Sequence, residues 1–270
     1  MADFNLSRHT IGFVIPEKDR ARALGSGTLL SFGRVEGILT AAHVLDEIVK
    51  VDEIGLLAFP VRADQAQRLR LQTQYTERVR IAGEAFSEYG PNLAFLRLPD
   101  KTIGDLKANS SFVNFQKQLA IACSGPPAET DTLDAVVGVV AEWSDEKPFA
   151  SGSLDITNIR GLLNVGSAIE IARHDGFDRL EFTPLPANGF KLPSSYGGTS
   201  GGGVWRAFTQ SRGDDKKYLK ELRLIGVAFF EGPRRDGSQT ILCHGPKSIY
   251  DRLAANIQER WAAELDLDNS

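Results

Sequence analysis

The feature that most constrains the fold of this 270-residue chain is a succession of short apolar stretches, each soon interrupted by glycine, proline, asparagine or aspartate. Such stretches are typical of β-strands, and their close spacing along the chain is typical of barrels and sandwiches. Only residues 248–265 repeat apolar side chains at the three-to-four-residue spacing of a helix. The expected strands are residues 25–32, 37–45, 53–61, 67–72, 77–86, 92–99, 117–125, 134–143, 168–175, 179–185, 201–208, 218–232 and 238–244.

A polar, weakly patterned segment divides this strand-rich sequence into two halves of comparable length. We take residues 100–116 as the connection between an N-terminal β-unit at 1–99 and a C-terminal β-unit at 117–245. Residues 246–270 then form a helix and a tail. A chain of this length buries about three quarters of its unfolded surface, so it needs no disulfide or metal to fold.

The charge balance excludes two classes of partner. Lysine and arginine number 31 against 35 aspartates and glutamates, which gives a net charge of −4 without any basic block. We therefore expect neither nucleic acid nor an anionic membrane as a partner. The first twenty residues are charged throughout and their one apolar run, IGFVIP, is too short for a signal peptide or a membrane span, so we expect a cytoplasmic protein.

The cysteines carry no signature of a disulfide framework or a metal site. Cys123 and Cys243 are the only two, and neither belongs to a CxxC motif. Free cysteines are among the most buried residue types, so we expect both thiols in the core. The sequence predicts no metal and no cofactor.

Two segments carry candidate chemistry. His43 lies in LTAAHV, at the expected end of an apolar strand, among small neighbours that leave an imidazole accessible. Ser200 lies in SYGGTSGGGVW, where the density of glycine lets several backbone N–H groups converge on one point. Acyl transfer needs this combination, because an imidazole activates the hydroxyl while N–H donors stabilise the developing oxyanion.

In this order and at this separation, the two motifs resemble those of the trypsin-like, chymotrypsin-fold serine proteases. The resemblance runs from about Gly25 to the C-terminal helix, and it includes the GSGTLL, NLAFLRLP and LIGVAFFEG strands. It implies an all-β fold of two six-stranded antiparallel β-barrels, residues 1–99 and 117–245, followed by a C-terminal helix. It also implies that His43 is the general base, Ser200 the nucleophile, and the N–H groups of Gly198 and Ser200 the oxyanion hole.

The third catalytic position departs from the family. Where the family pattern has an aspartate that orients the base, NLAFLRLP begins with Asn92. The same exchange in a well-studied triad lowers turnover about 10⁴-fold, because an amide favours the wrong imidazole tautomer. Three acidic residues remain open as substitutes, although no sequence argument brings any of them to His43: Asp46, Asp52 and Glu88.

Two neighbours of the catalytic positions also differ from secreted relatives. Thr199 precedes the nucleophile where many of them have an aspartate that pairs with a newly cleaved N-terminus, so we expect no activation by N-terminal processing. Val44 follows the base where they often have a disulfide-bonded cysteine, which agrees with a cytoplasmic location.

The resemblance places the substrate on the LIGVAFFEG strand, which would pair with an extended peptide by strand addition. Phe229, Phe230 and Glu231 are the expected wall of the primary pocket, and His244 is expected to line the same pocket. Glu231 either narrows that pocket, attracts a basic side chain, or points to solvent.

Three functions remain open at this point. The first is a serine endopeptidase, weak or highly selective because of Asn92, acting on protein or peptide substrates with or without a regulatory protein partner. The second is a protease-like module that binds extended peptides without cutting them. The third, an acyl hydrolase on another scaffold, fits least, since an α/β-hydrolase has its serine before its histidine.

Overall fold

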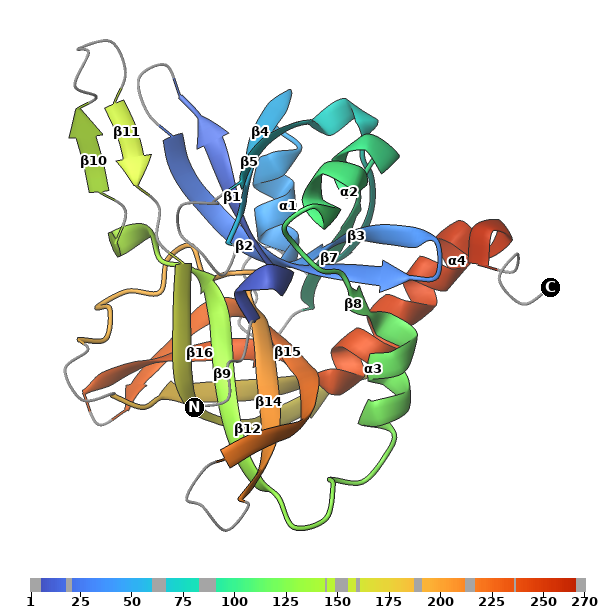
Figure 1. Cartoon of the computed structure of the whole chain (residues 1–270), viewed down its shortest axis with the longest axis vertical. Helices are drawn as coiled ribbons and strands as arrows, with labels where there is room; N and C mark the ends of the chain where they lie inside the picture. The colour runs from blue at the N-terminus through green and yellow to red at the C-terminus, as the bar shows by residue number, and fades with distance from the viewer. Residues whose placement is uncertain are drawn as a thin grey trace.

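Strands dominate the computed structural model, which describes residues 6–17, 21–59, 67–82, 91–143, 145–148, 155–158, 161–186, 191–211, 217–235 and 237–265. They form two antiparallel sheets, one in each half of the chain, and a helix follows the second sheet (Figure 1). The predictions of a mainly β protein and of a C-terminal helix are confirmed.

The N-terminal sheet contains eight strands, whereas the sequence predicted a six-stranded barrel. Seven of them lie in the order β5-β4-β1-β2-β3-β7-β6, and β8 forms a short parallel pairing with β2. Among the described pairings, none joins the two outer strands β5 and β6. The strands are β1 (Thr10–Pro16), β2 (Ala21–Phe32), β3 (Val35–Thr40), β4 (Glu53–Ala58), β5 (Gln67–Gln72), β6 (Glu77–Ala82), β7 (Asn92–Arg97) and β8 (Val113–Asn114).

The C-terminal sheet closes on itself. Six strands follow one another in the order β12-β13-β16-β15-β14-β9, and β9 pairs again with β12. Side chains in the first part of β12, residues 161–168, alternate between the buried interior and the outside, as in a barrel strand. The strands are β9 (Asp131–Val139), β12 (Gly161–His174), β13 (Phe177–Pro184), β14 (Gly203–Ser211), β15 (Lys217–Arg235) and β16 (Ser238–His244), with a separate pair formed by β10 (Asp145–Pro148) and β11 (Asp155–Asn158).

Short helices occur where the sequence pattern predicts strands or no element. The pattern predicts a strand over 117–125, but Asn114 caps a helix there by accepting a hydrogen bond from the Lys117 N–H at 2.7 Å. The connection at 100–116 also contains a helix and β8, so it packs as part of the N-terminal half. The helical elements are η1 (Leu6–His9), α1 (Ala42–Ile48), η3 (Thr73–Tyr75), α2 (Asp100–Lys107), α3 (Phe115–Ala122), η4 (Ala141–Trp143), the π-helical turn η5 (Ser248–Leu253) and α4 (Ala254–Leu265).

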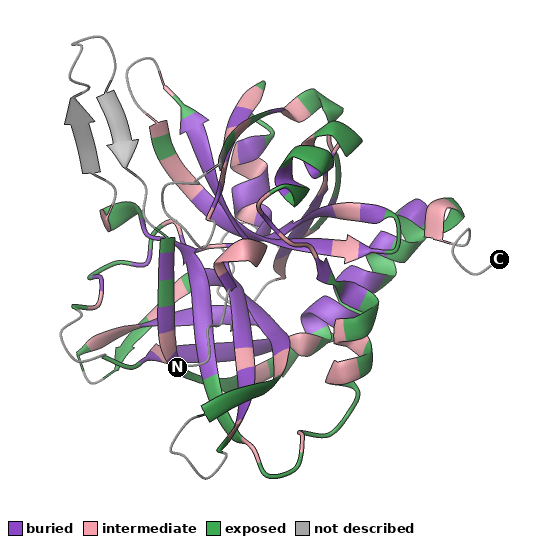
Figure 2. Cartoon of the chain, viewed as in Figure 1, coloured by how far each residue is buried: buried purple, intermediate pink, exposed green. Residues whose placement is uncertain are grey.

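The C-terminal helix ties the two halves together. One hydrophobic cluster combines residues of both sheets with η5 and α4 (Figure 2). The ring of Trp261 packs edge-on against Phe95 of β7, with centroids 5.9 Å apart. Glu264 binds both terminal nitrogens of Arg97, at 2.7 and 2.6 Å. The helix therefore supports the strand that begins with Asn92.

The two thiols differ in exposure. Cys243 is buried as expected, whereas Cys123 is exposed at the end of α3, so the expectation of two buried thiols is half wrong.

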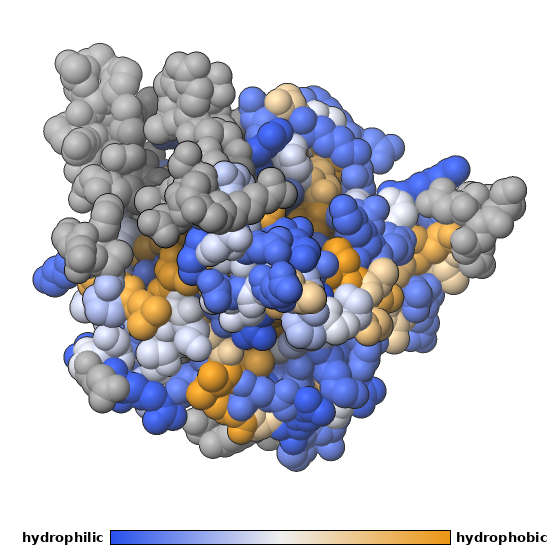
Figure 3. Space-filling view, turned by 60° about the horizontal axis from the view of Figure 1, so that its bottom comes forward, coloured by the Kyte–Doolittle hydropathy of each residue, from blue (hydrophilic) through white to orange (hydrophobic). Residues whose placement is uncertain are grey.

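Figure 3 shows a mainly hydrophilic face with separate hydrophobic patches. No helix in the described ranges has both the length and the apolar character that crossing a membrane requires.

Candidate active site

Strand register brings Asn92 to His43. β3 and β7 run antiparallel with Thr40 opposite Ala94, so the chain two residues beyond Thr40 lies beside the first residue of β7. His43 stands there, in the first turn of α1, and not at the end of a strand as the sequence suggested. The small residues Ala41 and Ala42 are buried, which lets the helix begin close to the sheet.

The Asn92 amide faces His43 at two points. Its Oδ1 accepts a hydrogen bond from the His43 backbone N–H at 3.1 Å, which orients the amide. The ring Nδ1 of His43 then lies 3.0 Å from Nδ2 and 3.3 Å from Oδ1 of Asn92. If Nδ2 donates, the imidazole proton stays on Nε2, and only if Oδ1 accepts from Nδ1–H is Nε2 free to act as a base. The geometry therefore lets two tautomers compete.

Burial lowers the pKa of His43 below its usual value of 6.5, while hydrogen bonding to Asn92 and the nearby charges of Asp46 and Glu47 oppose this shift. Asp46 does not replace the missing aspartate, because its carboxylate forms two hydrogen bonds to Arg80, at 2.6 and 2.8 Å. Among the described residues, no hydrogen bond joins the side chain of Asp52 to His43. Glu88 lies outside the described residues.

The glycine-rich turn before β14 brings Ser200 to the same place. The Ser200 carbonyl accepts a hydrogen bond from the Ser26 N–H of β2 at 2.7 Å. Gly25 lies between the two segments: a Cβ at this position would lie 2.8 Å from Val44 and 3.2 Å from the Ser200 carbonyl oxygen. The nucleophile turn and the helix that carries His43 therefore pack against one glycine.

The hydrogen bonds of this turn leave two donors open. The N–H groups of Thr199, Gly201 and Gly202 bind backbone carbonyls. Among the described residues, the N–H groups of Gly198 and Ser200 have no hydrogen-bond partner. The resemblance assigned these two donors to an oxyanion hole. Gly198 stands two residues before the candidate nucleophile, and the second N–H belongs to Ser200 itself.

Side chains outside the turn fix its conformation. Ser26 donates from its hydroxyl to the Gly198 carbonyl at 2.7 Å and accepts from the Val139 N–H at 2.7 Å. Thr199 is buried and donates to the Val139 carbonyl at 3.1 Å. Neutral hydrogen bonds thus hold the turn. Ser26 stands in an apolar strand, where no local pattern indicates this role.

The Ser200 hydroxyl does not bind His43 in this structure. Its Oγ donates to the Phe229 carbonyl at 3.3 Å, and no hydrogen bond joins it to the imidazole, although both residues are described. The serine side chain is therefore turned toward β15.

Two of the expected pocket residues lie in the interior instead of at an open wall. Phe229 is buried and stacks on His244, with ring centroids 4.4 Å apart. His244 is buried as well, and its Nε2 accepts a hydrogen bond from the Asn92 backbone N–H at 3.0 Å. Burial, helped by the charge of Arg179, lowers the pKa of His244 to about 3, so this ring stays neutral and supports Asn92 from the barrel side.

The other two expected pocket residues are accessible. Phe230 has 52% of its surface exposed. Glu231 uses its carboxylate to bind the chain before the nucleophile turn, accepting from the Ser195 hydroxyl at 2.6 Å and from the Tyr196 N–H. Contact with a substrate side chain remains a prediction for all four.

Gly201 offers a direct test of the turn. Its φ is +90°, and a Cβ there would lie 1.9 Å from the Ser26 carbonyl oxygen. Gly201→Ala should lower the free energy of unfolding by at least about 2 kcal/mol, because backbone strain and a backbone clash add. Gly104→Ala in α2, where nothing lies within 4 Å, is the control and should change it by no more than about 1 kcal/mol. Equal denaturation midpoints for the two variants would contradict this conformation of the turn.

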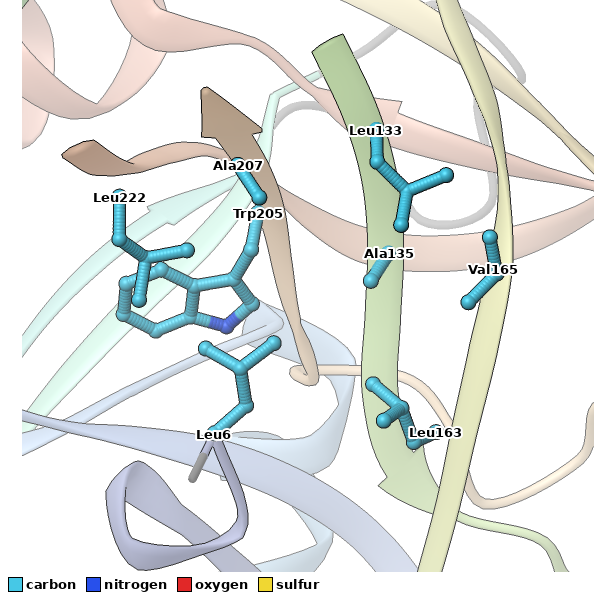
Figure 4. Close-up of a pocket in the computed structure, with 8 residues that line it drawn as sticks. All are labelled: Leu6, Leu133, Ala135, Leu163, Val165, Trp205, Ala207 and Leu222. Atoms are coloured by element: carbon cyan, nitrogen blue, oxygen red, sulfur yellow. The ribbon is translucent and has the colours of Figure 1, made fainter. Parts of the chain in front are cut away.

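A separate apolar pocket lies away from these residues. It has a volume of about 30 Å³ and contains none of the candidate site residues (Figure 4). It is lined by Leu6, Leu133, Ala135, Leu163, Val165, Trp205, Ala207 and Leu222. Its lining comes from η1 and the outside of the barrel, so it plays no part in the candidate site.

Comparison with known proteins adds little to this geometry. No family model matches the chain, and no curated protein matches it. One similar solved structure comes from work on the coupled folding and binding of the intrinsically disordered Sesbania mosaic virus VPg protein. The two chains share 14% identity over 91% of this chain and 90% of the other, with a TM-score of 0.44. A likeness at this level says nothing about what the chain does.

Proposed function

We propose that this protein is a trypsin-like serine endopeptidase, and that it cuts peptide bonds through an acyl-enzyme on Ser200. The observation that carries the proposal is the pair of N–H groups at Gly198 and Ser200, which have no hydrogen-bond partner among the described residues and belong to a turn that shares Gly25 as a neighbour with the His43 helix. Donors of this kind stabilise the oxyanion of a tetrahedral intermediate.

In the proposed reaction, the Ser200 hydroxyl turns from the Phe229 carbonyl to Nε2 of His43 and attacks the substrate carbonyl. His43 takes the hydroxyl proton and returns it to the leaving amine, and water then hydrolyses the ester by the same route. Asn92 supports the reactive tautomer only while its Oδ1 accepts from Nδ1–H. The competing contact with Nδ2 makes turnover slow.

The substrate in this proposal is an extended segment of a protein or peptide that pairs with β15. Phe230 is exposed beside the nucleophile and is the residue best placed to contact it. The lowered pKa of His43 keeps most of the imidazole neutral at pH 6.5 and above, as a base requires. The proposal places this activity in the cytoplasm and requires no cofactor.

A fluorophosphonate tests the proposal directly, because it reacts with a serine only when the neighbouring base and oxyanion donors work. We expect the unmodified protein to be labelled once, with the mass increase on the peptide that contains Ser200. A parallel sample unfolded in denaturant is the control and should stay unlabelled. Absence of labelling of the folded protein over hours, or labelling at another serine, would reject the endopeptidase.

A peptide-binding module is the second candidate, and two distances favour it. Nδ2 of Asn92 is the atom of the amide nearest to Nδ1 of His43, at 3.0 Å, and the Ser200 hydroxyl is bound to Phe229. Both features describe a resting site that holds its nucleophile unactivated. A protein that retains library peptides without cutting them or reacting with the label would be such a module.

A further inference from the structure

We propose that Glu231 is a positioning residue, whose carboxylate fixes the chain that leads into the Gly198–Ser200 turn and thereby directs the two open N–H groups. The inference rests on the proposed function and adds to it a residue that acts through the turn. Glu231 belongs to β15, beside Phe229 and Phe230, and it reaches across to a segment that has no strand of its own.

The contacts form a continuous series. Oε1 of Glu231 accepts from the Ser195 hydroxyl at 2.6 Å and from the Tyr196 N–H. The same hydroxyl oxygen of Ser195 accepts from the Gly197 N–H at 3.1 Å. The next N–H along the chain is that of Gly198, which is left open. Glu231 therefore binds the N–H two residues before the first proposed oxyanion donor, and it reaches the residue between them through the Ser195 hydroxyl.

A second carboxylate completes the support on the other side. Glu142 of η4 accepts from the Ser194 hydroxyl at 2.7 Å, from the Ser194 N–H at 3.3 Å and from the Ser195 N–H at 2.8 Å. These bonds lower the pKa of Glu142, led by the one from the Ser194 hydroxyl. From residue 194 to residue 197, every N–H is thus bound by a side chain. Side-chain acceptors therefore bind the N–H groups of this segment, while the N–H groups of Ala141 and Thr199 bind the carbonyls of Gly197 and Tyr196.

This role differs from the specificity role that the sequence suggested. A carboxylate in a primary pocket would favour arginine or lysine before the scissile bond through its charge. A carboxylate that positions the turn acts through an acceptor oxygen, which glutamine also has and leucine lacks. The two substitutions therefore separate the roles.

The experiment compares the rate of fluorophosphonate labelling, and kcat and KM for a cleaved peptide, in Glu231→Gln and Glu231→Leu. We expect Glu231→Leu to lose about 10²-fold in labelling rate and in kcat, the loss that follows when an oxyanion donor is displaced. Glu231→Gln should lose less than about tenfold, because a neutral acceptor is roughly half as strong as a charged one. Glu170→Leu, at an exposed ion pair with Arg173, is the control and should keep the unmodified rate.

Hydrogen exchange of the amides at 195–202 gives a readout that does not depend on catalysis. We expect faster exchange at Tyr196, Gly197 and Thr199 in Glu231→Leu, and protection restored in Glu231→Gln. If Glu231→Leu fails to fold, Ser195→Ala removes the shared hydroxyl, and it should speed exchange at Gly197 and slow labelling. If the unmodified protein is never labelled, the endopeptidase proposal is rejected. Hydrogen exchange alone then tests whether Glu231 positions the turn.

Two results would overturn the positioning role. One is unchanged exchange and labelling in both Glu231→Leu and Ser195→Ala while the unmodified protein reacts normally. The other is a Glu231→Gln protein that loses only its preference for basic side chains, seen as a raised KM for arginine and lysine peptides with kcat and labelling kept. That pattern assigns Glu231 to substrate specificity.

Discussion

Asn92→Asp should raise kcat for peptide cleavage by one to several decades, at about 1.4 kcal/mol of barrier per decade. The new carboxylate takes the place of an amide whose Nδ2 lies 3.0 Å from Nδ1 of His43. A carboxylate only accepts hydrogen bonds, so it removes the competing tautomer and stabilises the imidazolium that forms as Ser200 loses its proton. The backbone N–H of His43, which now donates to Oδ1 of Asn92, keeps its acceptor.

The same change should shift the pH profile. His43 is an effective base only when it is neutral, so activity falls as the pH drops through its pKa. In the unmodified protein burial lowers that pKa below 6.5, and the acid limb should have its midpoint below that pH. The new carboxylate stabilises the protonated ring and raises the pKa, which moves the midpoint to higher pH.

Asp46→Asn is the control for kcat, because the Asp46 side chain is paired with Arg80, and the change should leave kcat within a few-fold. If Asn92→Asp has no effect while the unmodified protein already reacts promptly with a fluorophosphonate, another group orients His43. An Asn92→Asp protein that remains inert to both label and peptide would exclude the protease and leave the peptide-binding module.

Ser200→Ala should abolish peptide cleavage and labelling altogether, since the proposed acyl-enzyme forms on its hydroxyl. The change removes one hydrogen bond, the 3.3 Å contact to the Phe229 carbonyl, and no packed apolar group. The free energy of unfolding should therefore change by no more than about 1 kcal/mol. Denaturant unfolding, measured on the same sample as the labelling, separates loss of chemistry from loss of fold.

Surviving activity in Ser200→Ala would remove this serine from the mechanism. Ser195→Ala serves as the matched comparison, because Ser195 stands in the same segment and its hydroxyl already binds Glu231. We expect Ser195→Ala to lower the rates of cleavage and labelling without abolishing them. Equal loss in the two variants would indicate that the segment, and not the Ser200 hydroxyl, is what the reaction needs.

Local patterns predict most of the strands of this protein. The alternation in QRLRLQ marks β5 with its observed bounds, and the apolar 3–4 spacing places the terminal helix. The pattern fails at KQLAIACSG, because an apolar run of this length fits a strand or a short helix equally well, and the Asn114 cap decides in favour of the helix. The expected strands also omit β1, which contains the apolar run IGFVIP.

Short motifs single out His43, Asn92 and Ser200. The structure joins Asn92 to His43 by hydrogen bonds, and among the described residues the N–H groups of Gly198 and Ser200 have no partner. The catalytic roles of these residues stay a prediction. The supporting residues were not predictable, because their roles depend on contacts far apart in the chain. Ser26 reaches Gly198 from 172 residues away, and His244 reaches Asn92 from 152. A serine or a histidine in an apolar strand gives no sign of such a partner.

The contact between α4 and β7 bears on when this protein becomes complete during its synthesis. Glu264 follows its partner Arg97 by 167 residues, and Trp261 follows Glu77 by 184. At the usual pace of about 5–20 residues per second, roughly 10–30 s separate β7 from the helix that packs on it. During that interval the His43–Asn92 pair has been made but α4 has not. Ser200 is also made only in the later part of the interval. Until α4 has been made, the strand that begins with Asn92 therefore lacks the packing of Trp261 and the ion pair with Glu264.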